Sequence, residues 1–283
     1  MPVLGVIGGS GLYQIEGLGS REELEVSTPY GAPSDRVIRG KLGDTTLLFL
    51  PRHGVGHRVP PHAINYRANI AALKQLGATH LLSVSAVGSM KEEIAPGHLV
   101  IVDQFIDLTR RRVSTFFDEG FVAHVSFSDP ICATMAAALA KAGIAAGGKV
   151  HPKGTYVCIE GPQFSTRAES LLYRSWGVSV IGMTAMPEAK LAREAELPFA
   201  VLALGTDYDC WHESGEAVTA DAVAEVMKKN VDVAKRAITE FAKTLPDPST
   251  CAGPGALKTA VMTAPHSISS EAKKKLAWLL GEN

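Results

Sequence analysis

Two aspartates, Asp207 and Asp209, follow a run of six mostly apolar residues, 199–204. Pro198 and Gly205 bound this run, which is typical of a buried strand. Open α/β sheets bind their ligands beyond the carboxyl ends of the strands. If the chain stays extended there, both carboxylates lie on one face, roughly 6–7 Å apart at about 3.3 Å per residue. The spacing therefore predicts a small site that two carboxylates share.

Such a pair is chemically useful because two close carboxyl groups cannot both ionise cheaply, so that one can keep a proton at neutral pH. Two other interpretations of Asp207 and Asp209 stay open on this pattern alone. One is a solvated acidic turn that caps the next helix, and the other is a Mg²⁺ site built on carboxylate oxygens. The remaining motifs of the chain have to decide among the three.

Residues that suit an oxyanion follow two predicted strands in the first quarter of the chain. Strand 3–7 leads into a glycine-rich loop that contains Ser10. Glycines let backbone N–H groups approach an anion closely, although a plain tight turn explains the loop equally well. Strand 45–50 leads into Arg52 and His53, a fixed cation beside an imidazole donor. This combination is typical of a phosphate or carboxylate site.

Further hydroxyl groups occur at the ends of two later strands. Ser85 and Ala86 lie near the end of strand 79–87, and Thr184 follows strand 178–181. Each hydroxyl has an alternative role, since it can simply be satisfied by neighbouring backbone. Considered together, the residues at these strand ends predict a binding site for an oxyanion such as free phosphate, opposite the two aspartates.

Several catalytic motifs are absent from the sequence. The dinucleotide fingerprint G-x-G-x-x-G fails because Gln14 stands where its last glycine belongs. No P-loop and no G-x-S-x-G elbow occurs. His53, His57 and His62 suggest zinc, but the glycines and prolines among them forbid the helix that would align them, and no thiolate or carboxylate joins them. We therefore expect neither a bound metal nor a dinucleotide.

Composition restricts the class of protein further. The chain has 283 residues, 46% of them hydrophobic, and a formal net charge of −1. Near-neutral charge argues against nucleic acid or a membrane surface as the main partner, so the run Arg110-Arg111-Arg112 predicts a solvated or subunit-contact face. Neither a signal peptide nor an apolar run of roughly 20 residues is found. We expect a cytoplasmic protein.

The cysteines carry a separate expectation about redox state. Their positions are Cys132, Cys158, Cys210 and Cys251, and no two of them form a C-x-x-C pair. Widely spaced cysteines in a chain of this size are most simply reduced thiols. The sequence therefore predicts no disulfide.

Predicted strands and helices alternate along the chain. The helix signals are a segment 63–76, a helix capped by Asp129-Pro130, a capping box at Thr166–Glu169, and segments 219–245 and 270–280. Another strand is expected over 97–107. The alternation predicts a single α/β domain over 1–245, with a mixed central sheet flanked by helices. Residues 246–283 are expected to be a linker and a C-terminal helix that packs on the domain or on a neighbouring subunit.

Six motifs follow one another in an order that is specific to one known family. They are IGGSGL at 7–12, PRHG at 51–54, SAVGS at 85–89, EGPQFSTRAE at 160–169, MTAMPEAKLA at 183–192 and TDYDCW at 206–211. The sequence resembles the trimeric purine nucleoside phosphorylase family, and within it the subfamily that acts on 5′-methylthioadenosine. The resemblance covers residues 3–245 and implies the fold of that family in a homotrimer or a hexamer. It also implies a nucleoside and phosphate as small-molecule partners, with phosphate a co-substrate and no further cofactor.

The resemblance implies a role for each candidate residue. The phosphate-binding set is Ser10, Arg52, His53, Ser85, Ala86 and Thr184. Met183 resembles the residue whose backbone contacts the ribose, Phe164 the aromatic wall of the base pocket, and Asp207 and Asp209 the pair at the purine N7 and 6-amino edge. Ser165 and Ala220 fall where family members adjust substrate choice, and Ala220, Val223 and the neighbouring subunit's His124 would enclose the 5′-alkylthio group.

The activity that the resemblance implies is phosphorolysis of S-methyl-5′-thioadenosine, a pentosyl transfer in purine and methionine salvage. Phosphate attacks C1′ through an oxocarbenium-like transition state, while a protonated Asp207 donates to N7 of the departing adenine. Two alternatives stay open. One is a phosphorylase of 6-oxopurine nucleosides or methylthioinosine, and the other is a non-catalytic nucleoside-binding protein.

Overall fold

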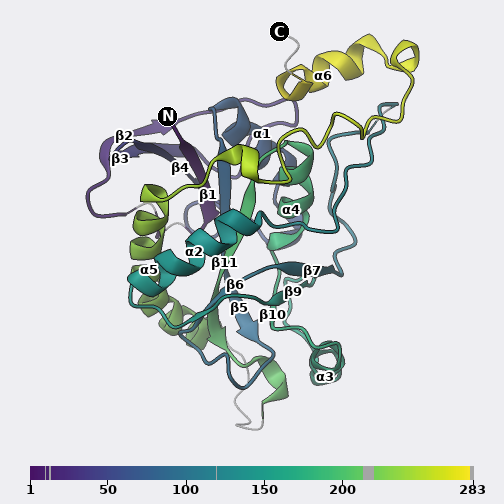
Figure 1. Ribbon diagram of the computed structural model, residues 1–283. Coiled ribbons are helices and arrows are strands. Elements are labelled where there is room, and N and C mark those ends of the chain that lie inside the picture. Colours follow the sequence, from purple (N-terminus) through teal and green to yellow (C-terminus); the bar gives the residue numbers. More distant parts are fainter. Residues whose placement is uncertain (10, 13, 119, 213–219, 281–283) are drawn as a thin grey trace.

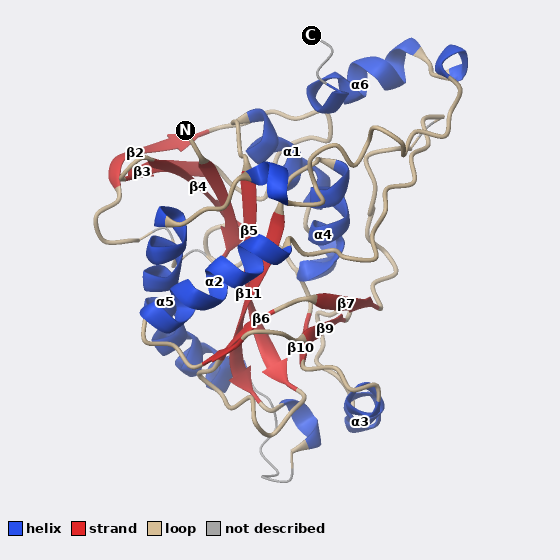
Figure 2. Cartoon of the chain, in the orientation of Figure 1, coloured by secondary structure: helices blue, strands red, loops and turns tan. Residues whose placement is uncertain are grey.

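The computed structural model describes residues 1–9, 11–12, 14–118, 120–212 and 220–280, with the side chains of 220–222 left out. Within these ranges eleven strands form one mixed sheet that helices cover on both faces (Figures 1 and 2). The strands are β1 (Val3–Gly8), β2 (Gly19–Leu24), β3 (Val37–Leu42), β4 (Thr45–Pro51), β5 (His80–Ser89), β6 (Leu99–Ile101), β7 (Gln104–Asp107), β8 (Val150–His151), β9 (Thr155–Cys158), β10 (Val180–Gly182) and β11 (Phe199–Asp207). The helices are α1 (Tyr66–Gln75), α2 (Ala133–Ala145), α3 (Arg167–Ser175), α4 (Ala185–Glu194), α5 (Ala220–Lys243) and α6 (Ser270–Leu280), with short 3₁₀ turns η1 (Pro61–Ala63), η2 (Asp209–Trp211), η3 (Pro248–Thr250) and η4 (Pro265–Ser267). The predicted α/β fold with a mixed central sheet is confirmed.

Strand β5 organises the centre of the sheet. Strands β1 and β11 pair with it in parallel, and β10 pairs with it in the antiparallel direction. In the register of β5 and β11, Ser85 lies opposite Ala203 and Gly88 lies opposite Asp207. The register shifts at a bulge between Gly205 and Asp207. The carboxyl ends of β5 and β11 therefore meet at one edge of the sheet, where their polar residues converge.

Two apolar cores lie on the two faces of this sheet. Successive strand residues point to opposite faces, so Leu81 belongs to one core and Leu82 to the other. Helices α1 and α4 pack on the first face, and α2 and α5 pack on the second (Figure 2). The long amphipathic helix α5 contributes Ile238 and Phe241 to the second core. Burial of these faces fixes the strand ends that carry the candidate residues.

Most of the helix predictions match the structure, and the capping box of α3 is confirmed in detail. Thr166 Oγ1 accepts from the backbone N–H of Glu169 at 3.2 Å, and the Glu169 carboxylate accepts from the backbone N–H of Thr166 at 2.7 Å. The cap predicted for α2 is wrong, because Cys132 occupies the N-cap position. The Asp129 carboxylate instead accepts from Ser128 at 3.1 Å, and the Asp129 carbonyl accepts from Arg193.

Two strand predictions need correction. Residues 97–107 form two strands, because β6 pairs with β11 and β8 whereas β7 pairs with β9. The antiparallel hairpin of β2 and β3 at the edge of the sheet was not predicted. Strand β2 is mostly exposed and carries charged residues, so its sequence has little of the apolar pattern on which strand prediction depends.

The arginine run is the clearest error about the surface. Arg110 and Arg111 are exposed, but the side chain of Arg112 is only 1% exposed. Its guanidinium turns inward and forms an ion pair with Glu160, with 2.9 Å between Nε and Oε1. A run of like charges therefore does not form one solvated face here, because the third member is drawn in by a carboxylate about 50 residues away in the sequence.

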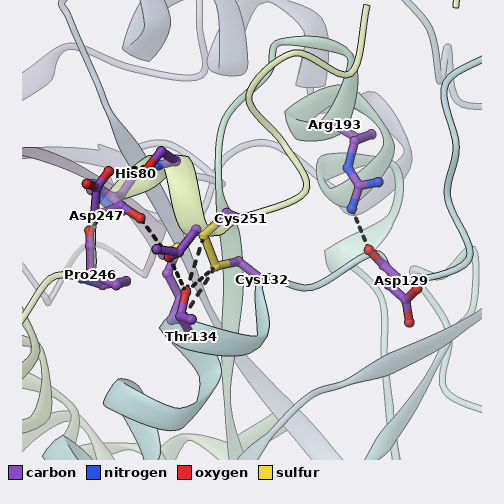
Figure 3. The surroundings of a disulfide bond; sticks show 11 residues. His80, Asp129, Cys132, Thr134, Arg193, Pro246, Asp247 and Cys251 are labelled. Carbon is purple, nitrogen blue, oxygen red and sulfur yellow. Dashed lines mark hydrogen bonds between the residues drawn. A yellow bond between two sulfur atoms is a disulfide. The ribbon is translucent and has the colours of Figure 1, made fainter. Parts of the chain in front are cut away.

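The expectation of four reduced cysteines is also wrong. Cys132 and Cys251 form a disulfide with 5.2 Å between their Cα atoms, across 119 residues of sequence (Figure 3). Both residues are buried where the segment after α5 crosses the start of α2. That segment is also held by the hydrogen bond between His80 Nε2 and the Pro246 carbonyl at 2.9 Å. Sequence spacing gave no sign of the pair because only the folded chain brings the two ends together.

The C-terminal segment crosses the body of the protein and ends in α6 (Figure 1). Its Ala260 carbonyl accepts from the backbone N–H of His124 at 2.8 Å. Leu276 and Leu279 of α6 join the same core as Phe116. None of the helices in the described ranges is both long enough and apolar enough to cross a membrane.

Candidate active site

A cavity of about 1000 Å³ opens at the carboxyl edge of β5 and β11. It brings together most of the residues that the sequence singled out. On the anion side these are Arg52, His53, Ser85, Ala86 and Thr184, and on the other side Phe164, Ser165, Met183, Asp207, Asp209 and Val223. The two groups come from separate strand ends and loops, and they line a single volume.

Three predicted residues stand apart from this set. Ser10 lies outside the described residues, and so does the side chain of Ala220 at the start of α5. His124 is exposed and is not among the residues that line the cavity of its own chain. The expectation for His124 concerned a neighbouring subunit, so it stays a prediction.

The two aspartates are close, but not in the geometry that we expected. Strand β11 ends at Asp207, and Asp209 has a left-handed φ of 52° at the start of η2. The expectation of two carboxylates on one face of an extended chain is therefore wrong. Instead, Asp207 Oδ1 accepts from the backbone N–H of Asp209 at 2.8 Å, and Oδ2 accepts from Thr206 Oγ1 at 2.7 Å. The turn places both carboxyl groups at the same wall of the cavity.

Asp209 is the more deeply enclosed of the pair. Its side chain accepts from Ser170 Oγ of α3 at 2.5 Å. Burial raises the pKa of Asp209, and the negative charge of Asp207 adds to that shift while the hydrogen bond from Ser170 opposes it. A proton is therefore held more readily at Asp209 than in an ordinary carboxyl group, which is the property that the paired carboxylates predicted.

Two backbone positions that the sequence analysis missed hold this acidic wall. A side chain at Gly88 would place its Cβ 2.9 Å from Asp207 Oδ1, so only glycine leaves room for the carboxylate. Gly205, at the bulge, donates to the His98 carbonyl at 2.9 Å and accepts from Asn230 Nδ2 at 2.9 Å. The bulge that aims Asp207 is thus fixed from β6 and from α5.

Arg52 is buried and is already paired within the protein. Its Nε and Nη2 atoms donate to Glu188 at 2.5 and 3.0 Å, and Ser83 Oγ donates to the same carboxylate at 2.7 Å. Burial alone would lower the pKa of Arg52, but the charge of Glu188, the hydrogen bonds to it and the nearby tyrosines together raise it, so the net shift is upward. Nη1 donates to the Val84 carbonyl at 3.0 Å, its single acceptor within the described ranges. Glu188 was not predicted, and it neutralises much of the charge that the sequence assigned to the anion site.

His53 is neutral at physiological pH. Burial and the charge of Arg52 lower the pKa of His53 to about 4. Its Nδ1 lies 2.8 Å from the Val59 carbonyl, which can only accept, so Nδ1 carries the proton. Nε2 is then an acceptor, and it suits the P–OH of a protonated phosphate rather than a bare oxyanion. The ring also stacks on His57 with 4.1 Å between centroids.

Two predicted hydroxyl groups meet on the anion side. Ser85 Oγ lies 3.0 Å from Thr184 Oγ1 and 3.2 Å from the hydroxyl of Tyr156. Burial raises the pKa of Tyr156 to about 12, so its hydroxyl stays protonated. Through its hydroxyl, Tyr156 thereby connects the ends of β5 and β10, although no sequence motif pointed to this residue.

The other side of the cavity is lined by loops. Phe164 is 46% exposed, while Ser165 Oγ is buried and has no hydrogen-bond partner among the described residues. A buried hydroxyl without a partner is a feature that a bound ligand atom can satisfy. Met183 packs against Gly161, where a Cβ would come within 2.5 Å of the Met183 sulfur. This wall is more open than the anion side and depends on close loop packing.

The histidines show no metal-binding arrangement. Among the residues that the structure describes, no cluster of three or more His, Cys, Asp or Glu side chains could hold an ion. The cavity therefore offers hydroxyl groups, the partly neutralised guanidinium of Arg52 and the neutral imidazole of His53 facing two carboxyl groups, and it is also lined by Arg58, Lys228 and Lys235. Such an arrangement can bind an anion and a polar heterocycle side by side.

Comparison with known proteins identifies the family of this chain. The family model described as the phosphorylase superfamily matches residues 3–243. The S-methyl-5′-thioadenosine phosphorylase of Geobacter sulfurreducens is 54% identical over 280 residues, which cover 99% of this chain and 98% of that protein. The protein of the same name from Hyperthermus butylicus is 51% identical and covers 92% of this chain and 95% of its own length.

Solved structures of the same type share the fold. The methylthioadenosine phosphorylase from an antarctic soil metagenomic library has a TM-score of 0.92 and 49% identity, with 98% of each chain covered. The methylthioadenosine phosphorylase from Schistosoma mansoni in complex with adenine has a TM-score of 0.86 and 35% identity, covering 92% of this chain and 99% of that one. The prediction of a phosphorylase-type enzyme is confirmed, and the chain belongs to the phosphorylase superfamily.

Proposed function

We propose that this chain catalyses the phosphorolysis of S-methyl-5′-thioadenosine to adenine and S-methyl-5-thio-α-D-ribose 1-phosphate, a step of purine and methionine salvage. The observation that carries the proposal is one cavity with an acidic wall at Asp207 and Asp209 and an anion wall at Arg52, Ser85 and Thr184. The names of the relatives support the same substrate.

The anion wall takes inorganic phosphate. Arg52 supplies the remaining N–H of Nη1, and the hydroxyl groups of Ser85 and Thr184 supply short neutral donors. The backbone of Ala86 and the loop around Ser10 complete the set, and His53 Nε2 accepts a hydrogen bond from the P–OH of the phosphate monoanion or dianion. Because Glu188 offsets the guanidinium, the wall binds phosphate without holding it so tightly that attack on C1′ becomes slow.

The acidic wall takes the base. Asp207 acts as the acid toward N7 as negative charge builds on the departing adenine. A carboxylate accepts from a 6-amino group, whereas a 6-keto group presents a second acceptor. A buried mismatch of that kind discriminates by about 10⁴.

Loops and helix α5 hold the sugar and the 5′ substituent. Phe164 stacks on the base, the backbone of Met183 meets the ribose hydroxyls, and Ser165 Oγ gains its missing partner from the ligand. The 5′-methylthio group lies against Val223 and Ala220. His124 of a neighbouring copy closes this end in a homotrimer or a dimer of trimers, which agrees with its exposure on its own chain.

The test is phosphate-dependent release of free base, with the sugar product identified. We expect adenine and methylthioribose 1-phosphate in equal amounts from S-methyl-5′-thioadenosine, and no release without phosphate. Faster release from inosine or methylthioinosine would favour a 6-oxopurine phosphorylase. Binding of the nucleoside without any turnover would instead favour a nucleoside-binding protein.

A further inference from the structure

Arg112 lies beneath the nucleoside side of the cavity and does not line it. Its five N–H groups lie within hydrogen-bond distance of six acceptors, three of which share the two N–H groups of Nη1. The six acceptors are Glu160 Oε1 at 2.9 Å, the Glu160 carbonyl at 2.7 Å, the Ile159 carbonyl at 3.3 Å, the Met183 carbonyl at 2.6 Å, the Met186 carbonyl at 2.5 Å and the Tyr66 hydroxyl at 2.9 Å. A buried guanidinium therefore joins three separate segments of the chain.

Each of those segments supplies part of the cavity wall. Ile159 and Met183 line the cavity directly. The Tyr66 hydroxyl, which accepts from Arg112, donates to the Pro61 carbonyl at 2.9 Å, and Pro61 also lines the cavity. The charge is balanced by Glu160, whose carboxylate also accepts from the backbone N–H groups of the two preceding arginines. These charge-assisted bonds lower the pKa of Glu160 and keep it ionised.

The planar fork of arginine is what this position requires. Five N–H groups in one plane can reach carbonyls on three segments, whereas a lysine ammonium offers three donors from a single point. Met183 is fixed from two directions: Arg112 holds its carbonyl, and its sulfur packs on Gly161, which has a positive φ of 68°. The orientation of the Met183 peptide is thus set by groups that do not contact the substrate.

We propose that Arg112 is a positioning residue that sets the nucleoside wall of the cavity, acting through the Met183 carbonyl and the 159–160 backbone. The inference rests on the proposed function for the assignment of that wall to the nucleoside. It deepens the function by predicting that the two walls respond differently to the loss of Arg112. Although the Met183 carbonyl shares a peptide group with the N–H of Thr184, the side chains of the anion wall have supports of their own. Arg52 is held by Glu188 and Ser83, and Thr184 is held by Ser85 and Tyr156.

The consequence is a selective kinetic defect. Arg112→Gln should raise KM for the nucleoside on the order of tenfold or more, since several charge-assisted hydrogen bonds are lost at once. KM for phosphate should stay within about twofold, because Arg52 and Thr184 keep hydrogen-bond partners of their own. Arg111→Gln is the matched control, because Arg111 is exposed and reaches Glu160 through its backbone N–H.

The experiment combines initial rates over both substrates with calorimetric titration of S-methyl-5′-thioadenosine, in the absence of phosphate so that it is not turned over, and of inorganic phosphate. Weaker nucleoside binding with unchanged phosphate binding in Arg112→Gln supports the proposal, and so does partial recovery in Arg112→Lys. Equal loss of both affinities, or behaviour like that of Arg111→Gln, overturns it. If Arg112→Gln does not fold, Arg112→Lys and Glu160→Gln are measured in the same way, and the same two results support or overturn the proposal.

The titrations also separate this proposal from the proposed function. A wild-type chain that turns over no nucleoside would contradict the function. Selective loss of nucleoside affinity in the Arg112 variants would still support a positioning role at this wall.

Discussion

The two walls of the cavity are built differently. The anion wall stands on strand ends of the central sheet, and its cation is buried and paired with Glu188. Apart from Asp207 at the end of β11 and Val223 of α5, the nucleoside wall is made of loops, with Phe164 almost half exposed and Ser165 Oγ unpaired among the described residues. The contrast indicates that the phosphate wall is formed before any ligand binds, whereas the nucleoside wall depends on contacts that the ligand completes.

The strongest way to break the anion wall is to remove Glu188. Glu188→Ala leaves the Arg52 guanidinium buried without its counter-charge, which should cost about 3–5 kcal/mol of unfolding free energy. Chemical denaturation measures the loss. Glu240→Ala, which removes an exposed partner of Lys243, is the control and should change stability by less than about 1 kcal/mol. Similar losses of unfolding free energy in the two variants would mean that the buried pair of Arg52 and Glu188 does not stabilise the anion wall.

The disulfide belongs to neither wall, so its loss should spare both. Replacing Cys132 and Cys251 with serine should cost about 2–5 kcal/mol, since the bond closes a loop of 119 residues in the unfolded chain. KM for the nucleoside and for phosphate should stay unchanged at 25 °C. Thermal unfolding with and without dithiothreitol measures the effect, and a wild-type protein insensitive to reductant would contradict it.

Crowding at Gly88 should disturb the acidic wall alone. The added methyl group of Gly88→Ala would meet Asp207 Oδ1 at 2.9 Å and Ile181 Cγ2 at 3.0 Å, an overpacking worth about 1–3 kcal/mol. KM for the nucleoside should rise while KM for phosphate does not. Gly19→Ala at the edge strand, where the nearest atom lies at 4.0 Å, is the matched control. A larger change in KM for phosphate would show that the two walls are not separate.

The smallest expected effect is a pH dependence from His53. Because the folded pKa is about 4 and the ordinary value is 6.5, the unfolded chain binds a proton in this interval that the folded chain does not. The contribution of neutral His53 to stability is complete above pH 6.5 and declines as the pH falls towards 4. His53→Gln should flatten that part of the Tm profile, and His62→Gln, at an exposed position, should not. Parallel profiles for wild type and His53→Gln would contradict the assignment.

The functional residues at the strand ends could be predicted from the sequence, but the residues that hold them in place could not. Apolar runs and glycines located Arg52, Ser85 and Asp207, since a buried strand has a local pattern. Glu188 lies within a helix and pairs with Arg52 across 136 residues, so no local pattern marks it. The same is true of the partners of Arg112.

The turn after β11 was mispredicted for a related reason. Extended geometry was the simplest assumption for Asp207 and Asp209, but the hydrogen bond from the Asp209 N–H to Asp207 closes a turn there. The cysteine pair likewise required the path of the C-terminal segment over α2. Long-range pairings of this kind follow from the fold rather than from spacing.

The central claim is that Asp207 and Asp209 face the base while the opposite wall holds phosphate. It is tested most directly by kcat and KM of Asp207→Asn with S-methyl-5′-thioadenosine and methylthioinosine at saturating phosphate. We expect kcat for S-methyl-5′-thioadenosine to fall about 10²–10⁴-fold with a much smaller change in KM. The preference for S-methyl-5′-thioadenosine over methylthioinosine should also fall, because the amide of the introduced asparagine can donate to the 6-keto group. An unchanged preference, or equal changes in kcat and KM, would contradict the account.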